Sequence, residues 1–161
     1  MKKYIYVLFA AFALSGCAGS DYVSPEKVAV DSVYAYNMSV LDNSGSPSAV
    51  VAKLNSVSLA GCPKPFAEAF GRYSAAWGGF AALEKQMYEQ DLKKADSTLA
   101  NFISSYQSNQ TRALVDLKAA WPEMASRIDA AGASLARAFA ELKSAGARYN
   151  AVYAPKSWYE L

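Results

Sequence analysis

Side chains that commonly carry catalysis are scarce in this chain of 161 residues, which contains no histidine. Without histidine, Ser-His and Cys-His nucleophile pairs and imidazole metal ligands are excluded. The CxxCH attachment of c-type haem and the Glu-x-x-His motif of di-iron bundles are excluded for the same reason. No P-loop or GxGxxG motif is present either. We therefore expect no cofactor, no metal site and no enzyme activity.

Paired carboxylates are the remaining catalytic possibility, because two acids with different pKa values can hydrolyse a glycosidic bond. Glu84 with Glu123, or Glu68 with Glu141, could meet if the helices that carry them pack together. Glu68 and Glu141 alternate with lysine or arginine, which is typical of a solvated surface. Glu84 falls on an apolar stripe, so we expect a buried carboxylate that fixes helix register through a salt bridge or a hydrogen bond. Catalysis by Glu84 is the alternative.

The first seventeen residues hold the most specific pattern in the chain. Two lysines follow the initial methionine, an apolar run extends from Tyr4 to Leu14, and Leu14-Ser15-Gly16-Cys17 follows directly. This order marks an export signal, and the run is shorter than the ~20 residues of a membrane span. The segment resembles the signal peptide and lipobox of bacterial lipoproteins. The resemblance implies diacylation of the Cys17 sulfur, cleavage before Cys17 and acylation of the new amine.

Signal cleavage would divide the chain into a signal peptide (1–16), a lipidated cysteine with its tether (17–23) and a single helical domain (24–161). The two lysines at the start leave with the signal, so sixteen basic residues fall to fourteen, which equals the acidic count. A balanced chain has no electrostatic attraction to phosphate backbones, so nucleic acid is not an expected partner. Lipoproteins retained in the inner membrane usually carry Asp after the cysteine. Ala18 therefore implies an outer-membrane protein, anchored by its acyl groups on the periplasmic face.

Cys62 is the only other cysteine, and it has no intramolecular partner once Cys17 is acylated. We expect a buried free thiol, because free cysteine is among the most buried residue types. Two alternatives remain open. Cys62 could form an intermolecular disulfide in a homodimer, or it could be redox-active, although no feature that would lower its pKa is visible.

Caps and turn residues place two short helices after the tether. Ser24-Pro25-Glu26 is typical of a helix start, and Asp42-Asn43-Ser44-Gly45 of a helix end. Ser46-Pro47 starts a second helix, which we expect to end at Gly61. Cys62-Pro63-Lys64-Pro65 then forms a stiff elbow, because proline restricts the backbone around it.

Two longer helical patterns of about forty residues follow, separated by a turn at Ser108-Asn109. In the first, Gly78-Gly79 is interpreted as a packing notch within one continuous helix. Its apolar stripe comprises Phe66, Phe70, Tyr73, Trp77, Ala81, Tyr88, Leu92, Ala95, Leu99, Ile103 and Tyr106. The second pattern combines two heptad rows, which resemble a coiled-coil seam: Leu114, Trp121, Ile128, Leu135, Leu142 and Tyr149; and Leu117, Met124, Ala131, Ala138, Ala145 and Val152.

Proline at position 122 should kink the second long helix without ending it. A new helix that begins at Pro122 is the alternative, but Trp121 is a poor N-cap. These elements together predict an all-α fold. We expect a four-helix arrangement, in which two short helices pack on a long antiparallel helical hairpin.

Two aromatic groups are candidate interaction surfaces. One follows the elbow and contains Phe66, Phe70, Tyr73 and Trp77; the other lies near the C-terminus and contains Tyr149, Tyr153, Trp158 and Tyr159. Core packing is expected for the first group, with a groove for a partner peptide or a lipid tail as the alternative. The second group is less easily explained by a core. We expect the segment from Ala154 onward to dock on the bundle.

Most of the sequence predicts an anchor and long helices. Few polar side chains are expected to meet at one site. We therefore expect a non-enzymatic, lipid-anchored protein that binds or positions another envelope protein. In its anchor and helicity it resembles the pilotins, which escort secretins to the outer membrane, although pilotins are generally shorter and often carry a disulfide. The alternative is a carrier or sensor of an apolar ligand such as an acyl chain. That alternative requires a connected apolar cavity of roughly several hundred Å³.

Overall fold

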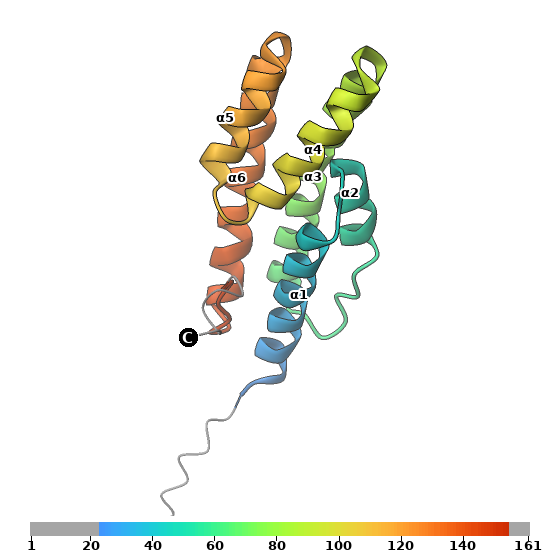
Figure 1. Cartoon of the computed structure of the whole chain (residues 1–161). Helices are drawn as coiled ribbons and strands as arrows, with labels where there is room; N and C mark the ends of the chain where they lie inside the picture. The colour runs from blue at the N-terminus through green and yellow to red at the C-terminus, as the bar shows by residue number, and fades with distance from the viewer. Residues whose placement is uncertain (1–22, 155–161) are drawn as a thin grey trace, which may run out of the picture.

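The computed structural model describes residues 23–154, and this part of the chain is helical, with no strand. Figure 1 shows the arrangement of its elements. The helices are α1 (Pro25–Asp42), α2 (Pro47–Asn55), α3 (Lys64–Gln90), α4 (Leu92–Tyr106), α5 (Gln110–Ala120) and α6 (Ala125–Ala147), with a 3-10 turn, η1 (Pro122–Met124), before α6. The all-α prediction is confirmed. The signal peptide, the lipidation site, most of the tether and the C-terminal segment with Trp158 and Tyr159 lie outside the described residues.

Helices α3 to α6 form an up-down-up-down bundle, in which each helix packs against the next and α3 packs against α6. Helix α2 packs on α3, and α1 packs against α2 and α4. Figure 1 shows two hairpins, α3–α4 and α5–α6, whose turns lie at one end of the molecule. The start of α1 and the end of α6 lie at the opposite end. Helix α1 therefore starts at the end of the bundle that lies farthest from the hairpin turns.

The start of each short helix follows its predicted cap. The Ser24 hydroxyl accepts a hydrogen bond from the Lys27 backbone N–H at 3.1 Å, and Ser46 accepts one from Ala49 at 3.3 Å. Each serine precedes a proline at the first helical position, where a missing N–H has no cost. Helix α2 ends at Asn55, earlier than predicted, and Gly61 takes a positive φ of 79° in the loop that follows.

The first long helix predicted from the sequence is two helices in the structure. Gly78-Gly79 does not break it, as predicted; a Cβ added to Gly79 would lie 3.4 Å from the Ala131 Cβ, so the notch brings α3 close to α6. The break comes instead at Asp91, whose backbone is extended and whose side chain accepts a hydrogen bond from the Lys94 N–H at 3.0 Å. Leu92 is 61% exposed, although the apolar stripe predicted it to be buried.

The second long helix also breaks, so residues 23–154 form six helices instead of the expected four. The prediction of a kink at Pro122 was wrong, and the alternative of a new start there is correct. No side chain caps this start. Tertiary contacts hold Trp121 at the break instead: its indole N–H donates to the Thr98 hydroxyl at 2.9 Å, and the Lys94 ammonium lies 4.1 Å from the ring centroid.

The heptad rows of the second pattern mark its buried face correctly. Trp121, Ile128, Leu135 and Leu142 are at most 1% exposed. Val152, the last member of the second row, is 72% exposed. Helix α6 ends at Ala147, so the heptad spacing no longer places later residues on the buried face.

Helix α1 joins the core through the buried Tyr34. Its hydroxyl donates to the Leu142 carbonyl of α6 at 3.0 Å, and its ring packs edge-on against Phe66. A Cβ on Gly146 would collide with the Tyr34 hydroxyl. Glycine at position 146 therefore allows α1 to approach α6.

Candidate functional site

A shallow groove runs along the solvent side of α3 and α6. Two adjoining hollows of about 470 and 330 Å³ share Arg72, Arg137 and Glu141. The groove extends on α3 from Pro65 to Ala76, which is roughly 16 Å at 1.5 Å per residue. This length matches about three turns of a partner helix.

The groove has an apolar floor of small residues and charged walls. Alanines at the α3–α6 contact line it, so a partner backbone can approach closely: Ala69, Ala76, Ala138, Ala140 and Ala145. Arg72 pairs with Glu141 across the groove, with Nε and Oε2 at 2.9 Å. Arg137 and Arg148 line the groove and have no ion-pair partner among the described residues. The groove therefore presents two uncompensated positive charges.

Glu68 and Glu141, one of the two carboxylate pairs considered from the sequence, both line this groove. Each is paired with a cation, since Glu68 Oε1 lies 3.9 Å from Lys64 Nζ and Glu141 pairs with Arg72. Both carboxylates are about half exposed, at 55% and 45%. They have the solvated surroundings that the sequence suggested for them.

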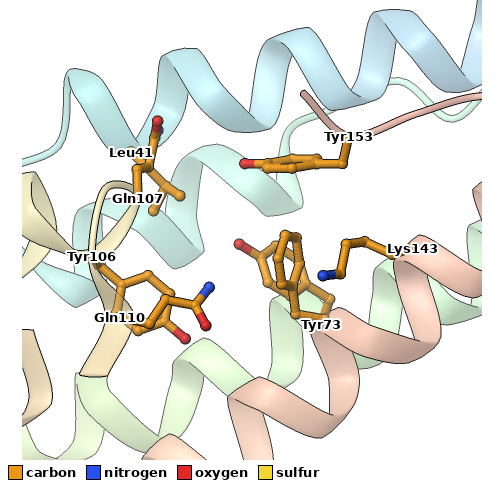
Figure 2. Close-up of a pocket in the computed structure, with 8 residues that line it drawn as sticks. Leu41, Tyr73, Tyr106, Gln107, Gln110, Lys143 and Tyr153 are labelled. Carbon is orange, nitrogen blue, oxygen red and sulfur yellow. The ribbon is translucent and has the colours of Figure 1, made fainter. Parts of the chain in front are cut away.

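A smaller cavity of about 200 Å³ lies where α1, α3, α6 and the α4–α5 turn meet (Figure 2). Its lining comes from parts of the chain that are far apart in the sequence: Leu41, Tyr73, Tyr106, Gln107, Gln110, Phe139, Lys143 and Tyr153. Figure 2 shows Lys143 on one side of the cavity and Tyr106 with Gln110 on the other, with Tyr153 lying across from Tyr73.

Two hydrogen bonds fix the wall of this cavity that faces α1. The Gln107 amide donates to the Met38 carbonyl at 2.7 Å, and the Asn37 amide donates to the Tyr153 hydroxyl at 3.1 Å. Asn37 itself is fully buried. These bonds tie both the α4–α5 turn and the segment after α6 to α1, so the cavity is a built feature of the fold.

Burial keeps the tyrosine hydroxyls of the cavity neutral. It raises the pKa of Tyr73 and of Tyr106 above the ordinary value. The pKa of Tyr153 is raised mainly by burial and further by nearby negative charge, including that of Asp42. All three hydroxyls therefore remain available as hydrogen-bond donors at any physiological pH.

The first aromatic group considered as an interaction surface lies in the core. Phe66, Phe70, Tyr73 and Trp77 are at most 2% exposed. These side chains fill the space between α3 and its neighbours, as core packing predicts. The alternative, an exposed groove formed by this group, is wrong. Of the second group, Tyr149 and Tyr153 are half-buried.

Glu84 is 7% exposed and binds the backbone at the start of α2. Its Oε2 accepts a hydrogen bond of 2.7 Å from the backbone N–H of Ser48, in the first turn of α2. A carboxylate here satisfies an unpaired N–H and interacts favourably with the positive end of the helix dipole. This contact explains its burial without catalysis.

Cys62 is a free, half-buried thiol in the elbow before α3, packed against the core. Burial raises the pKa of the Cys62 thiol. A raised pKa lowers the thiolate fraction, which disfavours a redox-active role.

The described residues contain neither a metal-binding cluster nor a membrane-spanning helix. In residues 23–154, no group of three or more Cys, Asp or Glu side chains is arranged to hold a metal ion. No helix in this part of the chain has the length and apolar character required to cross a bilayer.

Comparison with known proteins decides the role of the N-terminus. Residues 1–18 match the family model of the prokaryotic membrane lipoprotein lipid attachment site. The chain is a bacterial lipoprotein. No curated protein and no solved structure matches it. The lipoprotein is therefore lipid-anchored to a membrane, and its helical domain must be interpreted from its own geometry.

Sequence patterns did not reveal the cavity of the lipoprotein. Gln107, Gln110 and Lys143 lie in different elements and form no motif. Tyr106 and Tyr153 were read as parts of an apolar stripe and of a terminal aromatic group. The one available signal was the turn at Ser108-Asn109, which makes α4 and α5 adjacent and has one glutamine on each side.

Proposed function

We propose that this lipoprotein is a non-enzymatic protein of the outer membrane, on its periplasmic face, that binds and positions another envelope protein. The observation that carries the proposal is the groove between α3 and α6. Its alanine floor suits close approach of a helix, and Arg137 and Arg148 lack ion-pair partners among the described residues. Such a groove favours a helical segment with acidic side chains.

The position of the groove supports a partner close to the membrane. Its Pro65–Arg148 end lies at the same end of the bundle as the start of α1 (Figure 1). The tether from Ala18 to Val23 spans at most roughly 20 Å when extended. The groove therefore opens near the lipid surface. Ala18, in place of the Asp typical of inner-membrane retention, supports the outer membrane.

The alternative of an acyl-chain carrier receives less support from the cavities of the described residues. The cavity in Figure 2 has about 200 Å³, below the roughly 300–1,000 Å³ of common ligand sites, and polar groups interrupt its aromatic lining. The larger hollows have charged side chains in their walls, including one of about 520 Å³ beside Lys27 and Asp31. We therefore retain protein binding as the proposed function and give Cys62 no part in it.

Site-specific photocrosslinking in intact cells tests the proposal. A photoreactive residue in place of Ser144, in the groove, should capture a discrete partner, while the same residue in place of Ala119, exposed on α5 and outside the groove, should not. Arg137→Glu should reduce capture from position 144 at least fivefold without changing the amount of lipoprotein, because it replaces one of the two attracting charges. Equal capture at both positions, or none at position 144, would contradict the proposal.

A further inference from the structure

Some polar groups around the cavity between α1 and α6 have no ion-pair or side-chain hydrogen-bond partner among the described residues. The Lys143 ammonium lies 4.8 Å from the centroid of the Phe139 ring and has no carboxylate partner among the described residues. Among those residues, neither the Gln110 amide nor the Tyr106 hydroxyl makes a side-chain hydrogen bond, although Tyr106 is 3% exposed. Lys143 is exposed and Gln110 is half-buried, so solvent can reach both groups. A ligand in the cavity would therefore meet an ammonium, an amide and a phenol hydroxyl that are not hydrogen-bonded or ion-paired to other described side chains.

Charge and size limit what the species can be. One unpaired ammonium balances one negative charge, so a dianion such as phosphate would remain uncompensated. The volume of about 200 Å³ corresponds to roughly seven water molecules at about 30 Å³ each. The rings of Tyr73, Phe139 and Tyr153 contact one another along the wall, with centroid separations of 5.6 and 4.9 Å, and offer apolar surface between the polar ends.

We propose that this cavity binds a compact monocarboxylate, which pairs with Lys143 at one end and with Gln110 and Tyr106 at the other through an amide or hydroxyl group. Figure 2 shows these groups on opposite sides of the cavity, so a ligand with polar atoms at both ends spans them. The α1 side carries Asp42, whose negative charge contributes to the raised pKa of Tyr153. The carboxylate therefore lies toward α6, away from Asp42. This binding is separate from the groove and does not depend on the partner proposed above.

Two small probes of matched size test the charge requirement. N-acetylglycine carries a carboxylate and an amide, and N-acetylglycinamide replaces the carboxylate with a neutral group. Binding to the full acylated protein in detergent micelles is measured by saturation-transfer NMR and calorimetry. We expect N-acetylglycine to bind at least tenfold more tightly than the amide. Absence of saturable binding of N-acetylglycine at millimolar concentration would mean that the cavity holds water only and would overturn the proposal.

Matched variants locate the binding. Lys143→Met should weaken N-acetylglycine binding at least tenfold, and Tyr106→Phe, which keeps the ring, should weaken it at least threefold. Lys93→Met, at an exposed position of α4 away from the cavity, should leave the affinity unchanged. Unfolding curves identical to that of the parent show that each variant is folded. Equal affinity of the parent and the Lys143→Met variant would refute the site.

Discussion

Replacement of Leu135 by alanine is expected to lower the free energy of unfolding by about 2–5 kcal/mol. Leu135 is fully buried in α6, on the heptad row that faces the core. The substitution removes three buried carbon atoms and leaves a cavity that closely packed neighbours fill only in part. Chemical denaturation followed by helical circular dichroism measures the change.

Leu92→Ala is the matched control for this prediction, because it removes the same atoms from a side chain that is 61% exposed at the start of α4. Its expected effect is below about 0.5 kcal/mol. If Leu135→Ala also changed the stability by less than about 0.5 kcal/mol, the heptad row would face water and the packing of α6 would be wrong.

Replacement of Cys17 by serine is expected to abolish acylation and leave residues 1–16 attached. The lipid attachment site covers residues 1–18, and only the Cys17 sulfur within it can form the thioether bond to the diacyl group. Each buried CH₂ of an acyl chain contributes ~0.8 kcal/mol to membrane binding, so loss of all chains removes the anchor. Incorporation of an alkyne-labelled fatty acid and partitioning into detergent measure the effect.

Cys62→Ser provides the control, since it removes the other thiol and leaves the attachment site intact. This variant should incorporate the label and partition like the parent. Equal labelling of the Cys17→Ser variant and the parent would contradict the assignment of the anchor.

The sequence predicted those parts of the fold that depend on local chemistry. Serine caps followed by proline placed the starts of α1 and α2, and Asn109 caps α5 by accepting from the Arg112 N–H at 2.9 Å. Apolar spacing identified the buried faces, because burial follows helical periodicity directly. The Gly78-Gly79 notch was also readable, since glycine has no Cβ and permits the close approach of a neighbouring helix.

The two helix breaks were missed for a physical reason. Periodicity reports which face of a helix is buried, but it does not report whether the axis is continuous. The apolar stripe appeared to run through Asp91, although α3 and α4 are antiparallel neighbours that each bury a face of their own. Asp91, a good N-cap, was the available signal. At Pro122 the signal was weaker, because the contacts of Trp121 with Thr98 and Lys94 replace a local cap.

Neither candidate site could have been assembled from the sequence. The groove depends on which faces of α3 and α6 remain open after packing, and the cavity depends on the α4–α5 turn lying against α1 through Gln107. Both are consequences of tertiary arrangement. The anchor could be predicted, because the signal peptide and Cys17 form one continuous segment that is recognised without knowledge of the fold.

The mass of the intact protein purified from membranes tests the central claim, a helical domain held at a membrane by acyl chains on Cys17. The account predicts a polypeptide of residues 17–161 with the added mass of the diacyl group and an amide-linked acyl chain, all on the N-terminal cysteine. A polypeptide that retains residues 1–16 and carries no added lipid mass would contradict it.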